Sequence, residues 1–203
     1  MTDLTLQVII LRLIAYVFIA MIHGFAVAVV TVAAGDPGPR HDGRLSINPL
    51  THLNLIGAAS CALFSVGWIE PLAIDAARLR GGRLALALVV AAGAAATLAG
   101  AAALRLVRPF ILPLLPDTAS ATAFTLIEII GELSVWFALV NMLPLPPLTG
   151  AHLLAIVAPK RSKAIAGLAP YAGFVIVVAA ATGVVTRAVG PAYTTLARLL
   201  FGG

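Results

Sequence analysis

Residues 4–32, LTLQVIILRLIAYVFIAMIHGFAVAVVTV, contain a single charged side chain, that of Arg12. A helix needs roughly 20 apolar residues to cross the hydrocarbon core of a bilayer, and this stretch is longer. It is also longer than the apolar part of a signal peptide and has no basic region ahead of it. We therefore expect the stretch to be a retained transmembrane span.

The composition of the whole chain agrees with a membrane protein. Of its 203 residues, 61% are hydrophobic and 10% are charged, and the mean hydropathy is +1.07. A soluble domain of this size carries about a quarter charged residues. The lipid bilayer is therefore the expected solvent, and a single membrane domain covering 1–203 fits the length. The net charge of +5 is scattered between apolar runs, which argues against nucleic acid as a partner.

Apolar runs predict an all-α polytopic membrane protein with four spans. The predicted spans are residues 4–32, 83–106, 119–143 and 166–189. A fifth run, 53–68, is short for a crossing, and we expect it to be re-entrant. Re-entry places eight basic residues on one face and four on the other, whereas a crossing gives six and six. The positive-inside bias thus favours re-entry, with the amino terminus outside the cytoplasm.

Two segments outside the spans have recognisable patterns. The loop 35–50 has turn signals at Asp36-Pro37-Gly38 and then alternates polar and apolar residues, which predicts a short strand in a hairpin or paired with a partner chain. Near the carboxyl end, Gly190-Pro191 predicts a break, followed by an interfacial helix over 191–203.

Three stretches together resemble a known family. They are GDPGPRHDGRLSINPLTHLNLIG (35–57), GWIEPLAID (67–75) and NMLPLPPLTGAHLL (141–154). In content and order they look like the site-2 proteases, which are intramembrane zinc metalloproteases, and the similarity to the short bacterial members covers nearly the whole chain. The resemblance implies a bacterial cytoplasmic membrane protein. It also implies a zinc site built from His-Glu-x-x-His in the first span and an aspartate in the late span.

The residues at the positions of that zinc site have lost its chemistry. His23 matches the first ligand, but Gly24 stands at the general base, Val27 at the second histidine and Thr149 at the aspartate. Glycine and valine offer no donor atom, and a threonine hydroxyl is a poor zinc ligand beside a carboxylate. We therefore predict an inactive member of the family with no catalytic residues and no metal or other cofactor. His23 is then expected to be a buried imidazole bonded to a carbonyl or hydroxyl on another helix.

Two alternative functions remain open at this stage. One is an active metalloprotease with a rebuilt site, for which His23, His152 and Cys61 are the candidate ligands. The other is a small ion-coupled transporter that uses Glu128 and Glu132, which are four residues apart on one helix face.

The favoured hypothesis is binding without cleavage, as a scaffold or accessory subunit or by holding a transmembrane segment. In active relatives the loop strand and the proline break are thought to hold the substrate in extended form, and such edge-strand addition needs no catalyst. The expected binding residues are Arg44, Leu45, Ser46, Ile47, Asn141, Pro144, Pro147 and Thr149. A charge inside a bilayer needs a partner, so we also expect Arg12 to form an intramembrane ion pair with Glu128 or Glu132.

Overall fold

The computed structural model describes residues 4–161, 164–165 and 167–202. Ala166 and Gly203, which bound two predicted segments, lie outside the described residues, as does Lys163, one of the eight basic residues counted on one face.

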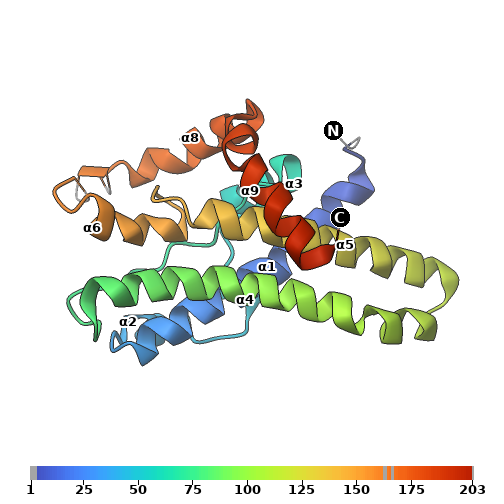
Figure 1. Cartoon of the computed structure of the whole chain (residues 1–203), viewed down its shortest axis with the longest axis horizontal. Coiled ribbons are helices and arrows are strands. Elements are labelled where there is room, and N and C mark those ends of the chain that lie inside the picture. Colours follow the sequence, from blue (N-terminus) through green and yellow to red (C-terminus); the bar gives the residue numbers. More distant parts are fainter. Residues whose placement is uncertain (1–3, 162–163, 166, 203) are drawn as a thin grey trace.

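Three long helices form the centre of the molecule. They are α1 (Leu6–Ala33), α4 (Gly82–Ile111) and α5 (Asp117–Asn141), and all three pack against one another (Figure 1). Each is long and apolar enough to cross a membrane. The helices predicted over 4–32, 83–106 and 119–143 are thus confirmed. Short helical turns join the larger elements: α2 (Gly38–His41), η1 (Pro49–Thr51), η2 (Leu112–Leu114), η3 (Thr149–Leu153) and α6 (Leu154–Val157).

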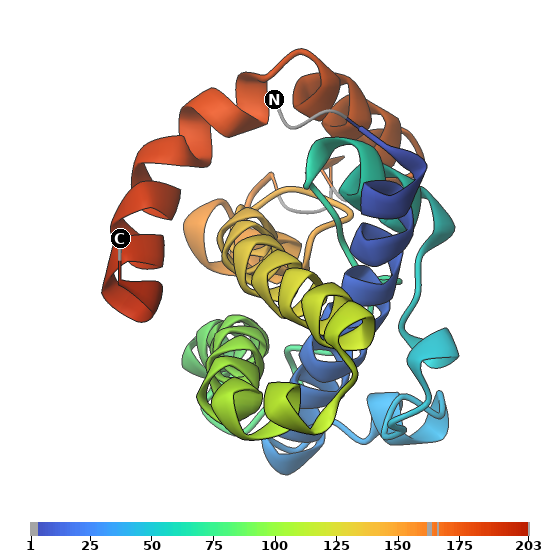
Figure 2. The ribbon, with the colours of Figure 1, turned by 90° about the vertical axis from the view of Figure 1, so that its right-hand side faces the viewer.

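The fourth predicted span is a bent pair of helices. Helices α8 (Ala169–Ala181) and α9 (Val184–Phe201) meet at an angle of 72° and lie on the outside of the three-helix centre (Figure 2). The bend is at Gly183, whose φ of 74° ends one helix and begins the next. The predicted break at Gly190-Pro191 is wrong, because α9 continues through Pro191. A proline removes one helix hydrogen bond, whereas a left-handed residue redirects the backbone.

The run predicted to re-enter the membrane contains one short helix, and the chain then returns to a point beside its start. Helix α3 (Leu55–Phe64) begins after Asn54, whose Oδ1 accepts a hydrogen bond of 2.8 Å from Gly57 N. On the return path Leu53 and Ile69 form an isolated antiparallel bridge, and Glu70 N donates to His52 O at 2.9 Å. The two ends of the run therefore lie side by side.

The predicted strand and hairpin in the loop 35–50 are wrong. Residues 44–48 are irregular, and the described part of the chain contains no strand beyond the isolated bridge. Side chains satisfy the backbone here: Ser46 Oγ accepts from Asn48 N at 3.0 Å, and Asn48 Oδ1 accepts from Leu50 N at 3.0 Å. Local bonds of this kind compete with strand pairing.

One buried apolar cluster lies between α1, α3, α4 and α5, and a second joins α5 to α8 and α9. Tyr16 is fully buried in it, and its hydroxyl donates to Trp68 O at 2.8 Å. On the other side of α5, Trp136 stacks on Tyr193 of α9, with ring centroids 4.5 Å apart. These contacts hold the loop after α3 and the bent pair against the central helices.

Candidate functional site

The four positions that the resemblance matches to zinc-site residues, here called the remnant positions, lie where α1 meets α4 and the turn η3. His23, Gly24 and Val27 occupy one stretch of α1 and are all buried. Thr149 begins η3, directly after the proline-rich break that ends α5. The fold thus brings residues 23 and 149 together, although 126 positions separate them in the chain.

His23 is hydrogen-bonded through both ring nitrogens. It is 1% exposed, with Nδ1 3.2 Å from Thr97 Oγ1 and Nε2 2.9 Å from Thr149 Oγ1. The Thr97 hydroxyl donates to Gly93 O at 2.8 Å, so its oxygen can only accept from His23. We infer that Nδ1 carries the proton and that the Nε2 lone pair accepts the Thr149 hydroxyl. The Nε2 lone pair, which would bind a metal, is therefore already occupied by the hydrogen bond from Thr149.

The remnant positions do not fit a zinc ion. Zinc sites in enzymes use three protein ligands with nitrogen, sulfur or carboxylate donors. Here one imidazole remains, and its free lone pair accepts from Thr149. Among the described residues, no group of three His, Cys, Asp or Glu side chains could hold a metal ion, so His23, His152 and Cys61 form no such group.

The place of the general base is filled by another histidine. A Cβ added to Gly24 would lie 2.3 Å from Nδ1 of His52, far inside contact distance. His52 is fully buried, and its Nε2 donates to Ser46 O at 2.9 Å. Burial lowers the pKa of His52, so its ring is neutral and its Nδ1 carries a lone pair. No hydrogen-bond partner for that atom lies within the described residues.

Close packing also fills the space around Val27, which stands at the position of the second histidine. A Cβ added to Gly93 of α4 would lie 2.7 Å from Val27 Cγ2 and 2.8 Å from His23 Cε1. Helix α4 therefore approaches α1 at van der Waals distance across the remnant site. Sequence reasoning did not identify Thr97 as a partner of His23.

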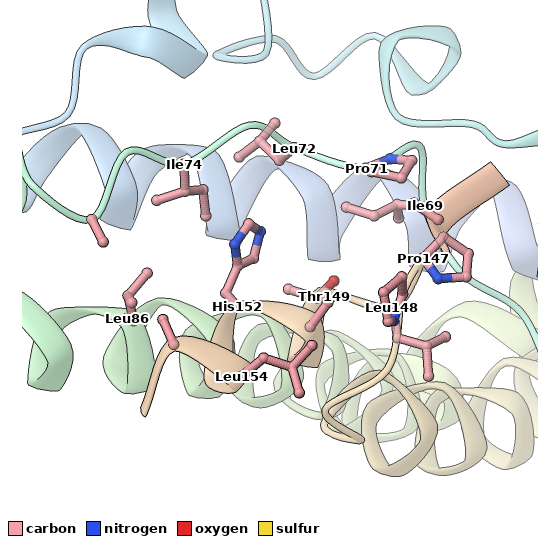
Figure 3. Close-up of a pocket in the computed structure, with 15 residues that line it drawn as sticks. Ile69, Pro71, Leu72, Ile74, Leu86, Pro147, Leu148, Thr149, His152 and Leu154 are labelled. Atoms are coloured by element: carbon pink, nitrogen blue, oxygen red, sulfur yellow. The ribbon is translucent and has the colours of Figure 1, made fainter. Parts of the chain in front are cut away.

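An apolar cavity of about 420 Å³ is lined by Thr149 but not by His23 (Figure 3). The segment 69–76 forms one wall, and the residues from Pro146 to Ala155 form another. His152 is the polar ring in the cavity; burial lowers its pKa, and the backbone of Leu72 partly offsets that shift. Sequence reasoning missed this wall, although GWIEPLAID was noted for its resemblance to the family.

The expected binding residues are only partly brought together. Pro147 and Thr149 line the cavity. Asn141 does not line it, and its side-chain amide donates to Gly67 O at 2.9 Å. Residues Leu45, Ser46 and Ile47 and Pro144 do not line it. Arg44 instead holds the loop together, because its guanidinium donates to the backbone oxygens of Thr51, Glu70 and Pro71.

The predicted ion pair between Arg12 and an acid of α5 is wrong. Arg12 Nη1 donates to the carbonyl of Ala62 at 3.1 Å, where α1 meets α3. Glu128 is bound by Arg105, at 2.6 Å, and by Arg108, both from α4. Helix α4 packs along α5 and presents its arginines at the depth of Glu128. A carboxylate held by two guanidinium groups gives no support to a proton path through Glu128.

Comparisons with known proteins point to one family. No family profile and no solved structure matches the chain significantly. A curated relative that does match is "Putative zinc metalloprotease YwhC" of Bacillus subtilis (strain 168). The two are 30% identical over 178 residues, which cover 82% of this chain and 80% of the relative.

Proposed function

The chain belongs to the YwhC family of zinc metalloprotease-like proteins, and on that premise we propose that it is an inactive, site-2-protease-like member that binds without cutting. In this proposal it holds a transmembrane or juxtamembrane segment of another membrane protein in extended form. It works as a scaffold or accessory subunit in the bacterial cytoplasmic membrane, with its amino terminus outside the cytoplasm.

The hydrogen bond between His23 Nε2 and Thr149 Oγ1, 2.9 Å long, carries the proposal. It links the side chains at the positions of two zinc ligands directly to each other. No pair of free donor atoms therefore remains there to bind a metal ion. Hydrolysis by this family's chemistry needs a metal-bound water and a general base. Neither Gly24 nor Thr149 can act as the base, and the His52 ring occupies the space in front of Gly24.

The cavity beside Thr149 supports the binding half of the proposal. Its volume of about 420 Å³ suits a few apolar side chains. A helix, roughly 10–12 Å across with its side chains, would not fit. An apolar segment in extended form is the occupant that matches both the volume and the apolar lining.

Metal analysis and a cleavage assay test the proposal that the protein is inactive. We expect the purified protein to contain far less than one zinc per chain and to leave membrane-protein substrates intact. About one zinc per chain that is lost in His23→Ala, or cleavage by the pure protein, would overturn the proposal.

Site-specific photo-crosslinking in native membranes tests the proposal that the cavity binds a segment of another protein. A photoreactive side chain at Ala151, which lines the cavity, should capture a discrete membrane protein. The same group at Leu88, which is 57% exposed on α4 and outside the cavity, is the matched control. Replacing Ala155 in the cavity wall with tryptophan should abolish the Ala151 product. Identical products from both positions would contradict specific binding in the cavity.

A further inference from the structure

Two arginines and one glutamate form a charged cluster near the carboxyl end of α4. Arg105 and Arg108 both bind the carboxylate of Glu128 on α5. Each guanidinium also lies over an aromatic ring, Arg105 over Phe201 at 4.5 Å and Arg108 over Phe124 at 5.0 Å from the ring centroid. The arginine side chains are 25% and 29% exposed. Two cations on one anion leave a net charge of +1 in a half-buried place.

The cluster borders a cavity that no acidic residue lines. The cavity has a volume of about 400 Å³ and lies between α4 and α9, lined by Ala102, Arg105, Leu106, Arg108, Leu200 and Phe201. A separate cavity on the other side of the cluster is lined by Arg198 and Glu132 together with Arg105 and Glu128, so the charges balance there. The uncompensated positive charge therefore faces the cavity between α4 and α9.

The arginines lie at the expected depth of a lipid headgroup layer. Arg83 begins the apolar part of α4 and Arg105 ends it. At about 1.5 Å per residue these two are roughly 33 Å apart, close to the thickness of about 30 Å of a hydrocarbon core. If Arg83 lies at one boundary of the core, the pair lies at the other.

We propose that the cavity between α4 and α9 binds an anionic phospholipid. The phosphate accepts hydrogen bonds from the guanidinium groups of Arg105 and Arg108, which suit planar recognition of phosphate. An acyl chain lies against Leu106, Leu200 and Ala102. A lipid matches the site better than a free anion does, because four of the six lining residues are apolar. This site is separate from the one proposed above and does not depend on it.

Native mass spectrometry of the full chain tests the proposal. The protein in detergent is offered equal amounts of phosphatidylglycerol and phosphatidylcholine with the same acyl chains. We expect one phosphatidylglycerol to be retained in preference. Arg108→Gln should weaken that retention by about tenfold, the size expected from losing a charge-assisted hydrogen bond. The matched control is Arg187→Gln, which removes an exposed arginine of α9 outside the cavity and should change nothing.

Two further variants keep the test decisive if Arg108→Gln folds poorly. Glu128→Gln removes the competing carboxylate and should increase retention of phosphatidylglycerol. Ala102→Phe keeps both arginines but fills the cavity and should reduce it. The proposal is overturned if the wild type does not prefer phosphatidylglycerol, or if Arg108→Gln and Arg187→Gln behave alike. It is also overturned if inorganic phosphate displaces the lipid as well as short-chain phosphatidylglycerol does, because the site would then take the free anion.

Discussion

At the scale of single residues, Gly24 and His52 use the same space. Any side chain at position 24 places its Cβ 2.3 Å from His52 Nδ1. Gly24→Ala should therefore lower the free energy of unfolding by about 1–3 kcal/mol, the usual cost of overpacking a core. Thermal unfolding in detergent measures the change.

Gly190→Ala is the matched control for this substitution. Gly190 is also inside a helix, but a Cβ there meets nothing within 4 Å. We expect it to be neutral or slightly stabilising. In a double-mutant cycle, the cost of Gly24→Ala should shrink when His52 is alanine as well. A cost that does not depend on residue 52 would rule out the steric explanation.

The Thr149 hydroxyl gives a second prediction at this scale. Thr149→Val keeps the shape but leaves Nε2 of the buried His23 without a donor. The expected loss of stability is about 1–3 kcal/mol, the cost of a buried unsatisfied polar group. Thr194→Val removes an exposed hydroxyl that bonds within its own helix, and it should change stability by less than about 0.5 kcal/mol. Equal effects of the two would contradict the inferred role of Thr149.

The absence of metal-donor atoms could be predicted from the sequence, but the ion pairs could not. Residue type alone shows that Gly24 and Val27 cannot bind metal. The partner of Glu128 depends on how α4 is rotated against α5, and helical spacing describes only one helix at a time. For that reason the sequence does not identify Arg105 and Arg108 as partners of Glu128. The contact between His52 and Gly24 likewise depends on a loop conformation that no local pattern encodes.

At the scale of elements, the bend between α8 and α9 depends on Gly183. Its φ of 74° is left-handed, which costs any other L-residue about 1–2 kcal/mol. Gly183→Ala should therefore destabilise the protein and reduce the bend of 72°. Pro191→Ala, inside α9, should leave the angle unchanged and strengthen the helix. Spin-label distances across the bend measure the first effect, and a change of angle caused only by Pro191→Ala would place the hinge at the wrong residue.

The long helices were predictable and the loops were not. Hydropathy over α1, α4 and α5 is high enough to locate each of them from composition. The residues Arg44 to Ile47 alternate as a strand does, but four residues give a weak signal. Side-chain bonds from Ser46, Asn48 and Arg44 to nearby backbone groups outweigh it.

At the scale of the whole molecule, the return of the chain after α3 makes a prediction about topology. Single cysteines replace Asp42, Asp75 or Asp117, all exposed, in a Cys61→Ser background. Because Leu53 and Ile69 pair with each other, we expect Asp42→Cys and Asp75→Cys to react from one side of the membrane and Asp117→Cys from the other. A membrane-impermeant thiol reagent applied to intact cells and to inverted vesicles distinguishes the sides. Reaction of Asp42→Cys together with Asp117→Cys, from the side opposite Asp75→Cys, would mean that residues 53–68 cross.

The position of the His52 ring also restricts the order in which this protein could change over evolutionary time. A mutation that put glutamate at position 24 would be harmful on arrival, because the imidazole of His52 already occupies that space. Residue 52 or its loop would have to move first, and that step alone brings no catalytic benefit. Packing therefore acts as a ratchet at position 24, because a glutamate is excluded there until residue 52 or its loop has moved.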